Sequence, residues 1–205
     1  MSTLRTVFAA LDARLELGPR WRGGEVDRLV DATHSALVDA AAAYVGPRGW
    51  QPVPEVTYSV FGERGSIDLL ALRQADSIVA MMEIKTSITS TEELLRRTDA
   101  KARLLPGIVL ERFGWRPATV ASILVVEDST TNRRRLRSIG PLLAARFPGS
   151  TVDTKRWLRS PATGTPGVWF LATMHERDAR SQMGGRERVH RPVEGLDPAG
   201  EPPRA

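Results

Sequence analysis

Two short apolar runs near the middle of the chain constrain its fold more than any other feature. Residues 67–72 and 78–84 are rich in Ile, Leu, Val and Met, and a polar pentapeptide separates them, which predicts a β-hairpin. A turn in the middle of that pentapeptide pairs residues whose numbers sum to about 151, so Asp68 lies opposite Glu83. Residues two apart share one face of a strand, so Lys85 lies beside Glu83. We therefore expect two carboxylates and one ammonium group together at one end of a sheet.

The three charged residues belong to a hairpin that is otherwise apolar. Burying a charge is unfavourable unless an opposite charge or a hydrogen bond compensates it. A divalent cation such as Mg²⁺ or Mn²⁺ would do so, because it prefers oxygen ligands. Asp68 and Glu83 are therefore candidate metal ligands. The alternative is a surface hairpin on which Asp68, Glu83 and Lys85 form an ordinary solvated ion cluster.

Periodicity along the chain predicts an α/β domain with a mixed central sheet flanked by helices. Apolar residues at helical spacing predict a long helix over residues 25–45. A capping box at Ser90 opens a second helix that reaches about residue 113, and Pro106 either kinks it or divides it in two. A nearly all-apolar run over 119–126 predicts a buried central strand. The other predicted elements are a helix at 3–11, strands at 13–17 and 55–61, a helix at 133–146, and strands at 152–157 and 167–173.

Composition suggests one domain with extensions at both ends. We expect an N-terminal extension over residues 1–24, the domain over 25–175, and a disordered tail over 176–205, which is polar and rich in Pro and Gly. No run of eighteen apolar residues occurs, so we expect no membrane span and no secretory signal. The chain contains no cysteine, which excludes disulfides, thiolate metal sites and cysteine nucleophiles. These features fit a cytoplasmic protein.

Charge is distributed unevenly along the chain. The net charge is +5, but residues 51–100 carry five basic and eight acidic side chains, whereas residues 101–160 carry twelve basic and four acidic ones. An acidic metal pocket beside a basic surface suits a polyanion such as nucleic acid. The alternative explanation of the many arginines is a bias in the base composition of the genome. The alternative for the arginine cluster at 133–137 is a solvated basic face of an outer helix. The candidate phosphate contacts are Arg64, Lys101, and the consecutive Arg133, Arg134 and Arg135.

An aspartate followed by Glu-x-Lys on the next strand resembles the PD-(D/E)xK nuclease superfamily, which has the restriction-endonuclease-like fold. The matching residues are Asp68, Glu83, Ile84 and Lys85. The proline that often precedes the aspartate is replaced by Ile67. The predicted order of helices and strands is also that of the superfamily. The segments WRGGEVDRLVDATHSALV, GERGSIDLLA, EIKT and TNRRRL resemble, over about residues 13–175, a largely uncharacterised actinobacterial domain of this fold found behind helix-turn-helix modules.

The resemblance implies a metal-dependent nuclease. Asp68, Glu83 and the backbone carbonyl of Ile84 would hold Mg²⁺ or Mn²⁺. Lys85 would stabilise the charge of the transition state or help to deprotonate the attacking water, and we favour the first role. Phosphodiester hydrolysis needs both an activated water and neutralisation of this charge.

The first helix is where members of the superfamily often add one more acidic ligand. Asp27 and Asp31 lie one helical turn apart, and either is a candidate for this ligand. Glu25 is a third option. The alternative is a solvated acidic first turn, which is common because acidic side chains interact favourably with the start of a helix.

The partner that the resemblance implies is nucleic acid, with DNA expected before RNA. Nucleases of this fold often dimerise to cut both strands, so a homodimer is a candidate assembly. Related domains commonly accompany transcription-factor modules. The alternative to an enzyme is therefore a catalytically idle nuclease fold that serves as a DNA-binding or regulatory interaction module.

Overall fold

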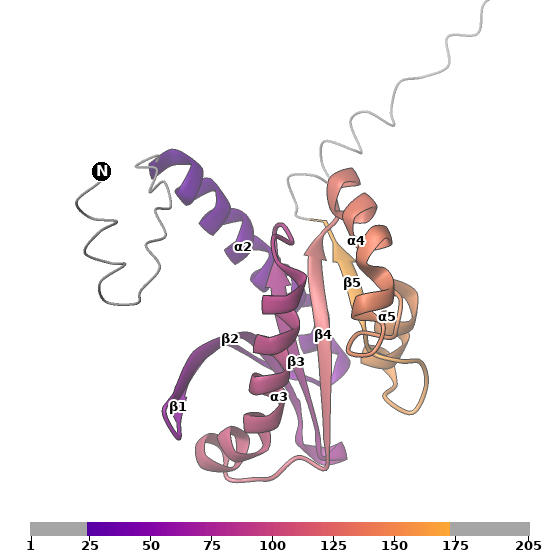
Figure 1. The fold of residues 1–205 in the computed structure, drawn as a ribbon. Coiled ribbons are helices and arrows are strands. Elements are labelled where there is room, and N and C mark those ends of the chain that lie inside the picture. The colour runs from indigo at the N-terminus through magenta and orange to yellow at the C-terminus, as the bar shows by residue number, and fades with distance from the viewer. Residues whose placement is uncertain (1–23, 173–205) are drawn as a thin grey trace, which may run out of the picture.

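The structure, a computed structural model, describes the backbone of residues 24–172 and the side chains from residue 31 onward (Figure 1). The predicted elements at 3–11 and 13–17 and the predicted tail at 176–205 lie outside these residues. The helices are α2 (Gly24–Val45), α3 (Thr91–Phe113), α4 (Thr130–Leu143) and α5 (Thr151–Arg159), with short 3₁₀ turns at Gly46–Arg48 and Gln74–Asp76. The strands are β1 (Gln51–Val60), β2 (Glu63–Arg73), β3 (Ile78–Lys85), β4 (Thr119–Glu127) and β5 (Val168–Leu171).

The five strands form one mixed sheet in the order β1-β2-β3-β4-β5. Strands β1, β2 and β3 are antiparallel neighbours, β4 lies parallel to β3, and β5 lies parallel to β4. The predicted hairpin register is confirmed, since Leu69 pairs with Met82 and Ala71 pairs with Ala80. The predicted fold class, α/β with a mixed sheet flanked by helices, is confirmed as well.

Helices cover both faces of the sheet (Figure 1). On one face, Leu37, Ala41 and Val45 of α2 and Trp157 of α5 pack against alternate residues of the strands, such as Met82. On the other face, α3 packs on β1, β2 and β3, and α4 packs beside the end of β4. Leu70 and Leu72 of β2 and Val79 and Met81 of β3 pack with α3. Because side chains alternate along a strand, Glu83 and Lys85 of β3 lie on this same face. Along β2 the alternation is interrupted at Asp68, since Ile67 packs on the α3 side and Leu69 on the opposite side.

Helix α3 begins and ends where its sequence predicts. The Ser90 hydroxyl accepts a hydrogen bond from the Glu93 N–H, which satisfies one of the free donors of the first turn. Gly114, with φ of 76°, ends the helix in the left-handed conformation that favours glycine. Pro106 lies inside one continuous helix, so the predicted possibility of two separate helices is wrong.

The ends of two other elements differ from prediction. Helix α4 starts at Thr130 rather than at residue 133, because the Ser129 hydroxyl accepts a hydrogen bond from the Asn132 N–H. It ends at Leu143, three residues before the predicted end. Strand β1 begins at Gln51 rather than at residue 55. Its two early prolines are compatible with its place at the edge of the sheet.

The segment predicted as a strand at 152–157 is instead helix α5. Ser150 and Asp153 form a reciprocal capping box, in which the Ser150 hydroxyl accepts from the Asp153 N–H and the Asp153 carboxylate accepts from the Ser150 N–H. Thr154, Trp157 and Leu158 are buried at helical spacing. The apolar content of so short a segment does not distinguish a strand from a helix, whereas the capping box is a specific signal for a helix start. The predicted strand at 167–173 is confirmed as β5 over Val168–Leu171.

None of the helices within residues 24–172 has both the length and the apolar content that crossing a bilayer requires.

Candidate active site

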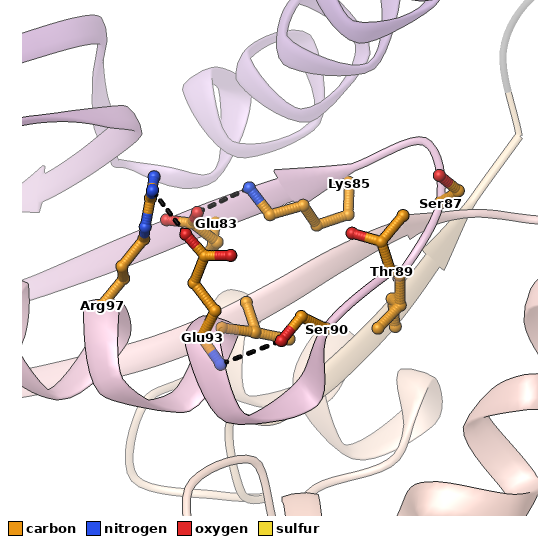
Figure 2. A pocket seen from close by; sticks show the side chains of 9 residues that line it. Glu83, Lys85, Ser87, Thr89, Ser90, Glu93 and Arg97 are labelled. Atoms are coloured by element: carbon orange, nitrogen blue, oxygen red, sulfur yellow. Dashed lines mark hydrogen bonds and ion pairs between the residues drawn. The ribbon is translucent and has the colours of Figure 1, made fainter. Parts of the chain in front are cut away.

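Glu83 lies near the end of β3 and is almost fully buried, with 3% of its surface exposed. Both of its carboxylate oxygens accept hydrogen bonds from lysines. The Lys85 ammonium lies 2.7 Å from Oε1, and the Lys101 ammonium of α3 lies 2.5 Å from Oε2. Figure 2 shows Lys85 extending along β3 with its ammonium group turned toward Glu83. The two lysines differ in burial, since 35% of the Lys85 side chain is exposed but only 8% of the Lys101 side chain.

Asp68 contacts the same end of β3 from β2. Its Oδ2 accepts a hydrogen bond of 2.7 Å from the backbone N–H of Ile84. The N–H and C=O of one strand residue point to the same side, so the Ile84 carbonyl also faces β2. The paired part of β2 and β3 ends at Leu69 and Met82, one residue short of Asp68. The Ile84 carbonyl therefore faces the place where the two strands part, and the Asp68 side chain reaches the Ile84 N–H from β2.

The two carboxyl groups have opposite pKa shifts. Burial would raise the pKa of Glu83, but the ammonium groups of Lys101 and Lys85 outweigh it and lower this pKa below its ordinary value. Burial and then the charge of Glu83 raise the pKa of Asp68, which the Ile84 N–H and the two lysines oppose only in part. Glu83 is thus held ionised, and Asp68 carries a negative charge less readily. Two neighbouring carboxyl groups with opposite pKa shifts are typical of a functional site, because a fold rarely buries charged groups without such a reason.

Lys101 was predicted as a candidate phosphate contact, but it lies against Glu83 in the structure. Leu94, Lys101, Leu105 and Ile108 recur along one stripe of α3, and all four are buried. A cation in an apolar stripe needs a carboxylate partner when the stripe is covered. This spacing was the available signal for an inward-facing Lys101, but it does not identify the partner.

A hollow of about 190 Å³ lies beside Glu83 and Lys85, between the end of β3 and the first turns of α3. Figure 2 shows that Ser87, Thr89 and Ser90 border it on the side of the connecting loop, and Glu93 and Arg97 on the side of the helix. Glu93 and Arg97 form an ion pair of 2.5 Å. Two acidic and two basic side chains line this hollow, so its net charge is close to zero.

The structure does not bring Asp31, one of the acidic candidates of the first helix, into the site. Asp31 is exposed on α2, and α2 packs against the face of the sheet opposite to α3. The side chains of Asp27 and Glu25 lie outside the described residues, so their role stays a prediction. Among the side chains that the structure describes, no third acidic or histidine residue joins Asp68 and Glu83 to form a group that could hold a metal.

The remaining basic candidates lie in two places, one on β2 and one at the start of α4. Arg64 lines a second hollow together with Lys101. Arg133 forms an ion pair with Asp128, Arg134 is exposed, and the Arg135 guanidinium donates to the Thr89 carbonyl in the loop beside the first hollow. The start of α4 therefore borders the site, and Arg134 and Arg135 are its basic groups without a carboxylate partner among the described residues.

A second contact ties α4 to the site. The Asn132 amide donates to the carbonyls of Thr86 and Glu127, which joins the loop after β3 to the end of β4. The buried Asn132 side chain thus fixes the loop that carries Ser87 and Thr89.

Comparison with known proteins does not assign this chain to a family. Neither a scan against protein-family models nor a search of curated proteins finds a match.

Proposed function

We propose that this protein is a metal-dependent phosphodiesterase that acts on nucleic acid, with DNA as the expected substrate. The observation that carries the proposal is the convergence of Asp68, Glu83 and Lys85 at one end of β3, with Asp68 bonded to the Ile84 N–H. The resemblance of these residues to the Asp and Glu-x-Lys of PD-(D/E)xK nucleases supports the same function. The basic groups of Arg64, Arg134 and Arg135 suit a polyanionic substrate.

The donor set fits Mg²⁺ or Mn²⁺, because it consists of the Asp68 and Glu83 carboxylates and the Ile84 carbonyl, all of them oxygen donors. A bound cation of this kind would neutralise charge on the phosphate and promote ionisation of a water molecule. To take part, Glu83 would exchange one lysine contact for the cation. Lys85 is the lysine that can give up this contact, because its side chain is partly exposed and water would solvate the ammonium group. Lys101 is buried and would be left without a partner.

This difference in burial gives the two lysines different roles. Lys101 holds the Glu83 carboxylate ionised and oriented from α3, so we regard it as a positioning residue. Lys85 borders the first hollow, where its ammonium group would stabilise the negative charge that develops on the phosphate during attack by water. A homodimer would give two such sites, one for each strand of a duplex.

One observation favours a second candidate function, a nucleic-acid-binding module with an idle nuclease fold. Both Glu83 oxygens are already neutralised by ammonium groups, and no third ligand from a described side chain joins the site. A cation would therefore compete with two lysines for one carboxylate. A module that only binds nucleic acid would keep the basic groups and need no cation.

Calorimetric titration with Mn²⁺ and a plasmid cleavage assay separate these two functions. We expect the wild type to bind the cation and cleave DNA, and Asp68→Asn to lose at least tenfold in affinity and nearly all cleavage. Asp39→Asn is the matched control, because Asp39 is exposed on α2 and should affect neither measurement. Equal Mn²⁺ binding by wild type and Asp68→Asn would refute the proposed site. DNA binding without cation binding or cleavage would establish the idle module instead.

A further inference from the structure

A second hollow, of about 330 Å³, lies on the α3 face next to the candidate active site, and we call it the basic hollow. Its lining includes four cationic side chains, Arg64, Arg96, Arg97 and Lys101, and only one acidic side chain, Glu63. The first hollow, by contrast, has balanced charge. Arg97 lines both, so the two hollows adjoin along the first half of α3.

Tyr58 of β1 also lines the basic hollow, and a glycine on the neighbouring strand sets the position of its ring. Tyr58 pairs directly with Gly65 of β2. A Cβ atom at residue 65 would lie 2.6 Å from the Tyr58 hydroxyl oxygen and 2.8 Å from the ring carbon that bears it. The ring therefore lies across the bare backbone of Gly65, a packing that any larger residue at this position would prevent.

The Tyr58 hydroxyl lies close enough to the active site to sense its charges. Burial raises the pKa of Tyr58, and the negative charges of Glu63 and Glu83 raise it further, while Arg97 opposes them. The phenol thus stays protonated at neutral pH and can donate a hydrogen bond. A protonated hydroxyl among arginines is a suitable donor to a phosphate oxygen.

The cations of the basic hollow differ in what already neutralises them. Lys101 is paired with Glu83, and Arg97 is paired with Glu93. Arg64 and Arg96 have no acidic partner among the described residues, and Glu63 is paired with Arg103, outside this lining. Two arginines and one hydroxyl group are therefore available to an anion in the basic hollow.

We propose that the basic hollow binds a backbone phosphate of the nucleic acid next to the phosphate that is hydrolysed, with the Tyr58 hydroxyl donating to a phosphate oxygen and Arg64 and Arg96 neutralising its charge. This proposal rests on the proposed function, because it takes the substrate to be nucleic acid. The shared residue Arg97 allows one strand to pass from the basic hollow to the first hollow. Tyr58 is then a substrate-binding residue, and Gly65 is a positioning residue that acts through it.

The test is binding of a fluorescein-labelled 16-base-pair DNA duplex and of its separate strands, followed by fluorescence anisotropy in EDTA, so that cleavage plays no part. Tyr58→Phe removes the hydroxyl and keeps the ring, and we expect binding to weaken about tenfold. The slope of log K against log salt should not change, because no charge is lost. Arg96→Ala should lower that slope by about one, because one phosphate contact is lost. Arg116→Ala is the matched control, since Arg116 is exposed beyond the far end of α3.

A double-mutant cycle tests how Gly65 acts. Gly65→Ala should weaken binding at least as much as Tyr58→Phe, because the new methyl group displaces the ring. In a Tyr58→Ala background the same change should alter binding less than about twofold, since no ring remains to be displaced. Equal effects of Gly65→Ala in both backgrounds would show that Tyr58 is not involved. Circular dichroism and thermal melting confirm that each variant is folded.

The outcomes separate this proposal from the proposed function. If the wild type cleaves DNA but Tyr58→Phe binds within twofold of it, the basic hollow is refuted and the nuclease stands. If the variants weaken binding as expected but the wild type never cleaves, the basic hollow stands and the nuclease falls. If the wild type binds neither the duplex nor its strands, both are refuted.

Discussion

Replacing Lys101 with methionine removes one of the two cations that hold Glu83 ionised and keeps most of the buried stem. The Lys101 ammonium lies 2.5 Å from Glu83 Oε2, and both side chains are more than nine-tenths buried. Breaking a buried ion pair by removing one partner costs about 3–5 kcal/mol. Glu83 keeps its contact with Lys85, so we expect a smaller loss of about 2–3 kcal/mol at pH 7. In a chain of this length that corresponds to a decrease of about 5–10 °C in melting temperature.

The loss should depend on pH in a definite direction. In the wild type the lowered pKa of Glu83 stabilises the fold above the ordinary value of 4.5, and this contribution is lost as the pH falls through the lower folded value. Without Lys101, burial is opposed by Lys85 alone, so the pKa of Glu83 rises. The ionised carboxylate then destabilises the variant at neutral pH, and protonation relieves this cost. The stability difference between wild type and variant should therefore shrink as the pH falls from 7 toward 4.

Urea unfolding at several pH values, followed by circular dichroism, measures this difference. Lys155→Met is the matched control, because Lys155 is half-buried and its ammonium lies 5.8 Å from the Tyr44 ring, with no carboxylate partner among the described residues. We expect that control to lose less than about 1 kcal/mol, with little dependence on pH. A Lys101→Met variant as stable as the wild type at pH 7, or a loss that stays constant down to pH 4, would refute the assigned ion pair.

Three further predictions concern the site and its surroundings. Burial and the charge of Glu83 raise the pKa of Asp68, so ionisation of Asp68 opposes folding once the pH rises above the ordinary pKa of an aspartate. Asp68→Asn should therefore raise the melting temperature by a few degrees at pH 7 but not at pH 3. An unchanged or lower melting temperature at pH 7 would contradict this. The start of α4 is neutralised by the combined changes Arg133→Gln, Arg134→Gln and Arg135→Gln. In a filter-binding series these changes should lower the slope of log K against log salt by about two rather than three, because Arg133 is already paired with Asp128. An unchanged slope would place the DNA contact elsewhere. Ser150→Ala removes the cap of α5 and should lower the free energy of unfolding by about 1 kcal/mol in urea titrations, whereas no loss would argue against the capping box.

The hairpin that carries the site could be predicted from sequence because its signals are local. Two apolar runs and a polar turn fix the pairing of β2 with β3, and period-two alternation then places Glu83 and Lys85 on one face. The error at α5 has a local cause as well. The apolar content of residues 152–157 does not by itself distinguish a strand from a helix, and the Ser150 and Asp153 cap is the more specific signal in a segment of nine residues.

Tertiary contacts account for what the sequence did not predict. Lys101 lies 18 residues after Glu83, and its role as an ion-pair partner depends on how α3 docks on the sheet. Tyr58 lies in the strand predicted at 55–61 and packs against the apolar cluster on the α3 side of the sheet. Its approach to the site depends on the glycine opposite it, and the cross-strand register that pairs Tyr58 with Gly65 was not predicted.

Cleavage and metal binding measured together on Lys85→Ala and Glu83→Gln test the proposed nuclease most directly. Lys85→Ala removes a group that stabilises transition-state charge, so it should keep Mn²⁺ and DNA affinity while cleavage falls by about 10² or more. Glu83→Gln removes a charged ligand, so both Mn²⁺ affinity and cleavage should be lost. Equal residual cleavage by the two variants, or no cleavage of DNA or RNA by the wild type with Mg²⁺ or Mn²⁺, would contradict a nuclease site built on these residues.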